Sequence, residues 1–264
     1  MSRALTVYAR AAAHAACEAG TLLAKHLGRP RSVRTKRSAV DLVTELDRSA
    51  EERIHRFLYR AFPELGFFGE ERGHRREESA GRWIVDPLDG TNNFVHGLPL
   101  FGVSIGLELG GSVIVGVIYD PMRRELFVAR KGLGATLNGR RIRVSSTRRL
   151  AHSLVSTGFS FRSHRSPQPY LRWFQTFQRR SHGVRRIGST VISLACVAAG
   201  RMEAFYERDL WPWDMAAGIL LVEEAGGRVS NFHGKAPVLG QGRLVASNGH
   251  IHQQMLRVLN SADG

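Results

Sequence analysis

The sequence of 264 residues contains few cysteines and no long apolar run, and each shortage limits the kind of protein it encodes. The two cysteines, Cys17 and Cys196, lie in separate apolar segments, so we expect packing residues in a reducing compartment and no disulfide. No apolar run approaches the roughly 18 residues that a membrane span needs, so we expect no membrane segment. Histidine and cysteine form no cluster, which argues against a zinc site, and no serine lies in a nucleophile elbow.

Lysine is also scarce, so the net charge of +15 comes overwhelmingly from arginine. Adjacent arginines recur at positions 75–76, 140–141, 148–149, 179–180 and 185–186. Clustered arginine is typical of nucleic-acid surfaces, because it neutralises phosphates, but it also occurs on solvated surfaces that steer small anions. Because the pairs are scattered and lack interleaved aromatic residues, we do not expect nucleic acid to be the main partner.

The N-terminal residues 1–27 could be mistaken for a secretion signal. Polar and charged side chains interrupt the stretch, however, and its apolar residues follow helical spacing at Leu5, Tyr8, Ala12, Ala16, Ala19 and Leu23. This pattern predicts an amphipathic helix that packs on the core, and we therefore expect a cytoplasmic protein.

Apolar periodicity and turn residues predict helices and strands along the whole chain, without repeats or long linkers. Helices are expected over residues 1–27, 45–62, 169–180, 189–200 and 214–225. Strands are expected over 40–43, 66–69, 83–85, 103–109, 113–119, 125–129, 135–137, 141–144, 154–157 and 203–206, with strand and turn over 227–248. The alternation indicates stacked α and β layers, with a boundary near residue 150 between residues 1–150 and 151–264.

Residues 83–94, Trp-Ile-Val-Asp-Pro-Leu-Asp-Gly-Thr-Asn-Asn-Phe, carry the most informative pattern. An apolar strand runs into Asp86 and Asp89, and strand ends open into crevices. Pro87 fixes one φ and Gly90 permits a backbone that a Cβ would block, so both carboxylates can point at one place. One interpretation is a Mg²⁺ site, because packed carboxylates repel each other unless a cation lies among them. The other is an ordinary Asp-Pro/Asp-Gly turn.

Weaker signals lie elsewhere in the chain. Asp214 begins an apolar helix and is well placed as its N-cap, which alone is the simpler role. The small residues 216–218 keep the first turn slim, so a ligand or another backbone can approach. Glu70-Glu71 alone is typical of a solvated loop, and Lys36 is weaker still. Thr44-x-x-Asp47 has the form of a capping box at a helix start.

In this order and spacing, these residues resemble the inositol monophosphatase family of Mg²⁺-dependent, lithium-sensitive phosphatases. The resemblance rests on Asp86-Pro-Leu-Asp89-Gly-Thr91 and Trp213-Asp-x-Ala-Ala-Gly218, with Lys36, Asp47 and Glu70-Glu71, and it covers nearly the whole chain. It implies an α/β fold of layered α+β type, a five-layer αβαβα sandwich as in sugar phosphatases. Metal-binding carboxylates would lie in residues 1–150 and substrate-binding residues in 151–264 of one catalytic unit, which commonly forms a homodimer.

The resemblance also implies a role for each matching residue. Glu70, Asp86 and the carbonyl of Leu88 would hold one Mg²⁺, Asp86, Asp89 and Asp214 would hold a second, and a third would contact Glu70 through water. Thr91 with Asp47 would orient and deprotonate the attacking water, and the backbone N–H groups of Gly90 and Thr91 would bind the phosphate. The alcohol would contact Asp89, Gly188, Ser189, Thr190, Glu207 and Asp214. Lys36 matches a lysine near the metals.

The substrate is less constrained than the reaction. Glu207 matches a glutamate expected to bind inositol hydroxyls, which favours myo-inositol monophosphate or a similar small polyol phosphate. Thr190 stands where many relatives have alanine, and residues 159–183 match poorly. Histidinol phosphate is the next candidate, followed by fructose 1,6-bisphosphate. From another class, a non-catalytic RNA- or transcription-associated role is favoured by the net charge of +15, but the intact carboxylates argue against it.

Overall fold

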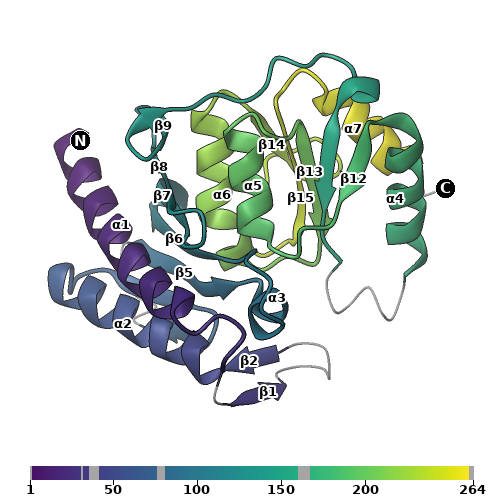
Figure 1. Cartoon of the computed structure of the whole chain (residues 1–264). Coiled ribbons are helices and arrows are strands. Elements are labelled where there is room, and N and C mark those ends of the chain that lie inside the picture. Colours follow the sequence, from purple (N-terminus) through teal and green to yellow (C-terminus); the bar gives the residue numbers. More distant parts are fainter. Residues whose placement is uncertain (1, 31, 36–41, 76–80, 160–166, 262–264) are drawn as a thin grey trace.

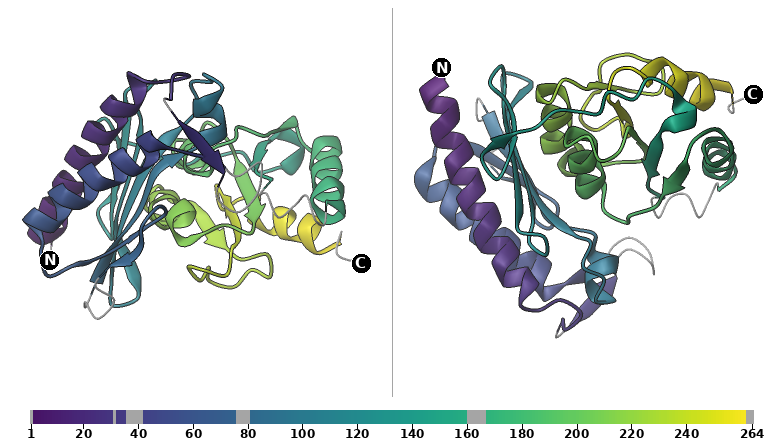
Figure 2. Two further views of the ribbon diagram at one scale, coloured as in Figure 1. Left: turned by 90° about the horizontal axis from the view of Figure 1, so that it is seen from below. Right: turned by 45° about the horizontal axis from the view of Figure 1, so that its top comes forward.

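The computed structural model describes all residues except 1, 31, 36–41, 76–80, 160–166 and 262–264, and it arranges them in five layers (Figure 1). From the N-terminal side these are a helix pair, an eight-stranded sheet, a second helix pair, a five-stranded sheet and a third helix pair. Figure 2 shows the layers from two further sides. The predicted αβαβα sandwich is confirmed. Within the described residues, no helix is both long and apolar enough to span a membrane.

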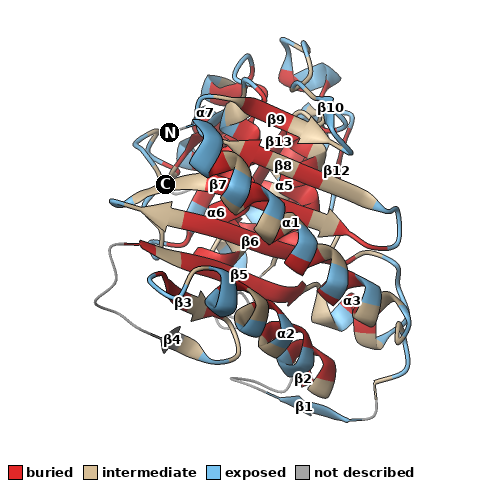
Figure 3. Cartoon of the chain, turned by 90° about the vertical axis from the view of Figure 1, so that its left-hand side faces the viewer, coloured by how far each residue is buried: buried red, intermediate tan, exposed pale blue. Residues whose placement is uncertain are grey.

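The first layer consists of α1 (Ser2–Ala24) and α2 (Glu45–Ala61), which cover one face of the eight-stranded sheet (Figure 3). The buried side of α1 is made largely of alanine, so the helix lies close to the sheet. Thr44 caps α2 through the predicted capping box, because its hydroxyl accepts backbone N–H groups while the Asp47 carboxylate accepts the N–H of Thr44. The cap places Asp47 in the first turn.

The eight-stranded sheet has the order β10-β9-β8-β7-β6-β5-β3-β4. Its strands are β3 (Gly66–Gly69), β4 (Gly73–Arg75), β5 (Gly81–Asp89), β6 (Gly102–Leu109), β7 (Ser112–Asp120), β8 (Glu125–Arg130), β9 (Gly134–Leu137) and β10 (Arg140–Arg141). All neighbours pair antiparallel except β3 and β5, which are parallel. Of the predicted strand over 141–144, only Arg141 lies in a strand, β10, which forms a hairpin with β9.

The five-stranded sheet has the order β12-β11-β13-β15-β14. Its strands are β11 (Leu154–Thr157), β12 (Gly183–Arg185), β13 (Ala204–Arg208), β14 (Arg228–Ser230) and β15 (Arg243–Ser247). The helices α5 (Thr190–Ala198) and α6 (Pro212–Glu224) lie between the two sheets, and α4 (Gln168–Arg180) and α7 (His252–Ser261) form the last layer. The short elements β1 (Val33–Thr35), β2 (Leu42–Thr44), α3 (Thr91–Val95) and the 3₁₀ turn η1 (Leu150–His152) complete the description.

Small residues allow α6 to pack directly on the backbone of the first sheet. A Cβ added to Gly106 would lie 3.0 Å from the Cβ of Ala216, and one added to Gly116 would lie 2.7 Å from the carbonyl oxygen of Ala217. The sequence left open whether a ligand or another backbone approaches the small residues 216–218, and in the structure it is the backbone of β6 and β7. This contact fixes the helix that carries Asp214.

The boundary near residue 150 coincides with the change from one sheet to the other. Because α5 and α6 from the second half cover a face of the first-half sheet, the two halves share a core, and the division into halves stays a prediction. Cys17 and Cys196 are free, half-buried thiols, and burial raises the pKa of each.

Candidate active site

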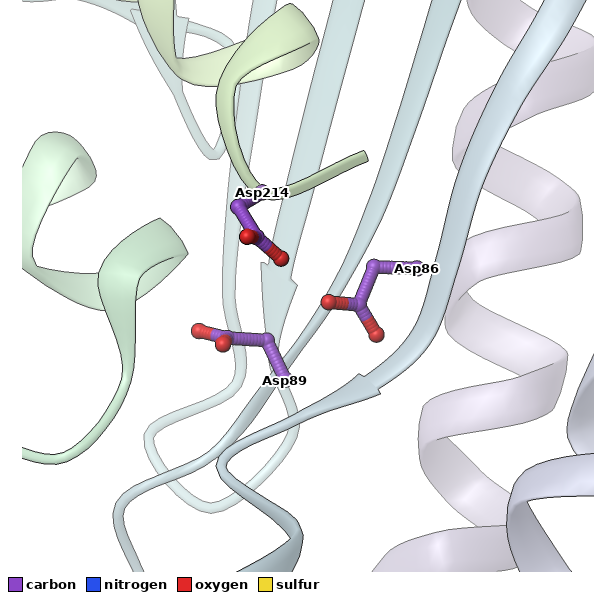
Figure 4. A group of neighbouring side chains, drawn as sticks. All are labelled: Asp86, Asp89 and Asp214. Carbon is purple, nitrogen blue, oxygen red and sulfur yellow. The ribbon is translucent and has the colours of Figure 1, made fainter. Parts of the chain in front are cut away.

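Three aspartates converge between the first sheet and α6 (Figure 4). Asp86 and Asp89 lie at the end of β5, Asp214 lies in the first turn of α6, and one oxygen of each lies within 4.8 Å of the other two. Residues three apart on a regular strand point to opposite faces. The pairing of β5 with β6 is interrupted between Asp86 and Asp89, and this bulge turns both carboxylates to one side. Pro87 lies in that interruption, as the sequence predicts for a turn.

Asp214 occupies a different helix position from the predicted N-cap. The helix begins two residues earlier, at Pro212, and the backbone N–H of Trp211 donates to Asp214 Oδ2 at 2.7 Å. Proline suits the first position of a helix because the N–H that it lacks would have no intrahelical partner there. Ser104 on β6 donates to the carbonyl of Trp213 at 3.3 Å, which ties this turn to the strand beside Asp86.

The electrostatics of the three aspartates favour a bound cation. Burial, with a smaller contribution from the carboxylate of Glu70, raises the pKa of Asp89 to about 6, although hydrogen bonds from Ser189 and Val191 lower it. Burial, with repulsion from Asp89 and Glu70, also holds the pKa of Asp214 well above its usual value. Such shifts show that the carboxylates repel each other when no cation compensates their charge. The donors are all oxygens, which suits a hard divalent cation and not zinc.

Thr91 and Asp47 form a hydrogen-bonded pair beside the aspartates. Thr91 Oγ1 lies 3.1 Å from Asp47 Oδ1 and 3.1 Å from the carbonyl oxygen of Leu88, and donates to these acceptors. Asp47 is fully buried, and its other oxygen accepts the N–H of Thr44 at 2.8 Å, so its orientation is fixed. The pair brings together two residues 44 positions apart, as the resemblance implied.

Gly90 makes the turn into α3 possible. Its φ of 96° lies in the left-handed region, and an added Cβ would lie 3.0 Å from the carbonyl oxygen of Leu100 and 3.3 Å from that of Gly188. The Asn93 amide joins the same two segments, donating to the carbonyls of Leu100 at 2.8 Å and Ile187 at 2.9 Å. These contacts hold residues 89–91 against residues 187–188, where the part of the site that comes from the second half begins.

The second half surrounds the aspartates with hydrogen-bonding groups. Asp89 Oδ2 accepts the Ser189 hydroxyl and the backbone N–H of Val191, the latter at 2.9 Å. Thr190 donates from Oγ1 to Glu207 Oε2 at 2.9 Å. Burial raises the pKa of Glu207 to about 8, although the hydrogen bond from Thr190 and the charge of Arg186 lower it.

One cavity of about 200 Å³ unites most of the predicted residues. Its lining includes Glu70, Asp89, Gly90, Thr91, Gly188, Ser189, Thr190, Glu207 and Asp214. Asp47, Asp86 and Leu88 lie behind this lining and are linked to it through Thr91 and Asp89 as described above. Lys36 lies outside the described residues. The geometry is consistent with the predicted roles, which stay predictions.

Sequence reasoning missed several residues that line the same cavity, among them Phe159, Arg186, Asp209 and Trp211. Arg186 belongs to one of the adjacent arginine pairs, but its position two residues before Gly188 indicates that it can lie at the site. Asp209 has a φ of 66°, which is rare for a residue with a side chain, and Tyr170 of α4 donates a hydrogen bond to its carboxylate. Nothing in the local sequence pattern indicates that contact.

Comparison with known proteins identifies the family. The profile of the inositol monophosphatase family matches residues 4–263. The chain belongs to this family. It is 42% identical over 254 residues to Nus factor SuhB of Pseudomonas aeruginosa, with 94% of each chain covered. It is also 42% identical over 247 residues to an inositol-1-monophosphatase of Mesorhizobium japonicum, with 93% of each covered.

A solved inositol monophosphatase from Anabaena has the same fold, with a TM-score of 0.89 and 38% identity over 97% of this chain and 96% of that one. The chain is therefore an enzyme of a phosphatase family, and the acidic cluster agrees with the metal dependence of that family. The expected fold and reaction class are thereby confirmed, while substrate and metal identity are matters for proposal.

Proposed function

We propose that the protein is a Mg²⁺-dependent phosphomonoesterase that hydrolyses myo-inositol monophosphate, or a similar small polyol phosphate, to the alcohol and inorganic phosphate. The observation that supports this is the convergence of Asp86, Asp89 and Asp214 beside the Thr91–Asp47 pair, at a cavity that also contains Glu207.

Two or three Mg²⁺ ions fit the donors present, with Glu70, Asp86, the carbonyl of Leu88, Asp89 and Asp214 as the residues that would hold them. When bound, such a pair of ions lowers the pKa of water and stabilises the charge on the leaving alcohol oxygen. Thr91 orients the attacking water, and Asp47, which accepts the Thr91 proton, receives the proton that this water loses through the hydroxyl.

The remaining residues bind the substrate on either side of the reacting phosphorus. The backbone N–H groups of Gly90 and Thr91 bind the phosphate oxygens. Asp89, Gly188, Ser189, Thr190, Glu207 and Asp214 contact the alcohol. Polar lining of this kind suits a hydroxyl-rich alcohol, because each hydroxyl both donates and accepts hydrogen bonds.

The direct test is phosphate release from a substrate panel, with Mg²⁺ present or chelated and with or without Li⁺. The panel contains inositol 1-phosphate, histidinol phosphate, fructose 1,6-bisphosphate and a nucleotide, so that the alternatives within the family are ranked in one experiment. We expect inositol phosphate to have the highest kcat/KM, and activity to be lost on chelation and inhibited by Li⁺. A higher kcat/KM for histidinol phosphate would replace the proposed substrate.

Asp89→Asn tests the site itself. The change preserves shape but removes one charge from the metal cage, so we expect kcat to fall at least a hundredfold while the melting temperature in chelator stays at or above that of the wild type. The rise in melting temperature on adding Mg²⁺ should shrink as well. Near-normal Mg²⁺-dependent hydrolysis by Asp89→Asn would contradict the assignment, and Asp209→Asn, a cavity carboxylate outside the cage, is the matched control.

A second candidate function follows from the name of the Pseudomonas relative, a Nus factor, and from the net charge of +15. A nucleic-acid surface would require the arginine clusters to share one face. Arg148–Arg149 lie near the end of α4, since His152 stacks on His182 at 5.8 Å between ring centroids, whereas Arg140–Arg141 form β10, an edge strand of the other sheet. Arg186 lines the cavity. This scatter favours the phosphatase as the main function.

The assembly and location are also proposals. We propose a homodimer, as the resemblance implies, and a cytoplasmic location, as the amphipathic N-terminal helix led us to expect. Sedimentation of the purified protein tests the oligomeric state. Binding of a transcription-related RNA in the same preparation would support the second candidate function.

A further inference from the structure

The carboxylate of Glu207 has an internal partner in the wall of the cavity. Glu207 lies on β13 and Thr190 begins α5, and the Thr190 hydroxyl donates to Glu207 Oε2 at 2.9 Å. Both residues are buried, with exposed fractions of 7% for Glu207 and 9% for Thr190, and both line the cavity. The hydroxyl that serves Glu207 therefore comes from the protein itself and does not depend on a substrate.

The backbone beneath Glu207 keeps the carboxylate in place. A Cβ added to Gly158 would lie 2.1 Å from Glu207 Oε2 and 2.2 Å from Cδ and Oε1, so the carboxylate lies directly over the bare backbone of Gly158. Thr190 is β-branched and has few rotamers, which keeps its hydroxyl aimed at Oε2. Glu207 is thus enclosed from two sides and cannot swing toward bulk water to find another donor.

This arrangement changes how the cavity discriminates between alcohols. A buried acceptor that only a substrate hydroxyl can satisfy makes the site reject analogues lacking that hydroxyl, because the acceptor is then left unpaired. Here the Thr190 hydroxyl satisfies one oxygen of Glu207 whatever alcohol is bound. The loss of binding free energy for an alcohol that lacks the hydroxyl is therefore smaller than it would be without Thr190.

We propose that Thr190 is a specificity-determining residue that broadens the range of alcohols the enzyme accepts, by satisfying Glu207 in place of a substrate hydroxyl. The proposal rests on the proposed phosphatase function of the same cavity. It assigns to this chain a wider tolerance of small phosphate monoesters, because binding depends less on the hydroxyl pattern of the alcohol than in a site without this internal donor.

Two substrates that differ only in hydroxyl groups test the proposal: myo-inositol 1-phosphate and cyclohexyl phosphate. The measured quantity is the ratio of their kcat/KM values in wild type and three variants. Thr190→Val keeps the shape but removes the hydroxyl, Thr190→Ser keeps the hydroxyl but removes the methyl group, and Thr190→Ala removes both. Each variant is checked for wild-type melting temperature and Mg²⁺ activation.

We expect the wild type to hydrolyse both esters. Thr190→Val and Thr190→Ala should raise the ratio in favour of inositol phosphate by about tenfold, because Glu207 then depends on the substrate for that hydrogen bond. Thr190→Ser should keep the wild-type ratio. A general structural defect would lower both kcat/KM values together and leave the ratio unchanged.

Three results would overturn the proposal: a ratio within twofold of wild type in Thr190→Val and Thr190→Ala, a shift in Thr190→Ser as large as theirs, or a wild type that hydrolyses inositol phosphate but not cyclohexyl phosphate. Failure of the proposed function is distinguishable, because the wild type would then release phosphate from no member of the wider substrate panel.

Discussion

The close contact between β7 and α6 predicts that Gly116→Ala weakens metal binding from outside the site. The added Cβ would lie 2.7 Å from the carbonyl oxygen of Ala217 and 3.1 Å from its Cα, whereas ordinary contact begins at 3.4 Å. Because the opposing atoms belong to backbone, the helix itself must move, by about 0.7 Å if the strand stays in place. Overpacking of this kind costs about 1–3 kcal/mol of folding free energy.

The same shift would move Asp214, which lies less than one helical turn before Ala217. Mg²⁺ binding requires near-ideal octahedral geometry with oxygens about 2.0–2.1 Å away, so a displacement of several tenths of an ångström is a large error. We expect the Mg²⁺ concentration for half-maximal activity to rise about tenfold or more. Isothermal calorimetry with Mg²⁺ measures the same change without substrate.

Gly106→Ala is the matched variant, because its Cβ meets a side chain and not backbone. The clash there is with the Cβ of Ala216 at 3.0 Å, and the other atoms lie 3.4 Å or more away. The double variant Gly106→Ala/Ala216→Gly should therefore bind Mg²⁺ as tightly as Ala216→Gly alone. Ala217→Gly should not restore the Mg²⁺ affinity of Gly116→Ala, because the clash there is with backbone atoms. Unchanged Mg²⁺ affinity in Gly116→Ala, or its rescue by Ala217→Gly, would refute this account of how the layers position the aspartate.

Two further predictions concern buried groups outside the metal cage. Glu51 is fully buried on α2 and accepts the backbone N–H of Glu71 at 2.8 Å. Glu51→Ala should therefore loosen the turn that carries Glu70 and raise the Mg²⁺ concentration for half-maximal activity several-fold, whereas Glu51→Gln should not. An equal effect of the two variants would contradict this expectation. Burial lowers the pKa of His252 to about 4, whereas the unfolded chain binds this proton near pH 6.5. The free energy of unfolding of the wild type, measured in urea, should therefore fall by about 2 kcal/mol between pH 7.5 and 4.5, and His252→Gln should not show this loss.

Local signals in the sequence predicted the elements that local physics determines. The capping box of Thr44 and Asp47 occurs where its spacing indicates, and the five predicted helices and nearly all of the predicted strands are present. By contrast, β12 (Gly183–Arg185) has only three residues, and it is a strand because it pairs in parallel with β11. Such a strand depends on its partner β11, which lies outside the short stretch of sequence over which apolar periodicity is judged. The helix α7 is absent from the predicted elements, although its buried residues Met255, Leu256 and Leu259 have helical spacing.

The candidate site likewise contains residues that local sequence places and residues that only long-range contacts place. Proline and glycine in residues 86–90 predicted that two carboxylates would share one side, and the bulge in β5 confirms the physical reason. Asp214 could not be placed there by local pattern, because its approach depends on Gly106 and Gly116, more than ninety positions earlier in the chain, which admit α6 against the sheet. Only the resemblance to a family supplied that long-range relation.

The position of Asp89 is set both by local sequence and by long-range contacts. Its position at the end of β5 is locally determined, yet its carboxylate accepts hydrogen bonds from Ser189 and Val191 of the second half and lies within 4.8 Å of an oxygen of Asp214. A change that shifts α5 relative to the first sheet therefore alters the metal cage and the substrate wall together. The backbone of Thr190 also hydrogen-bonds Asp89, but its hydroxyl donates to Glu207, so a change confined to the Thr190 side chain can alter the substrate wall and leave the backbone contacts of the cage in place.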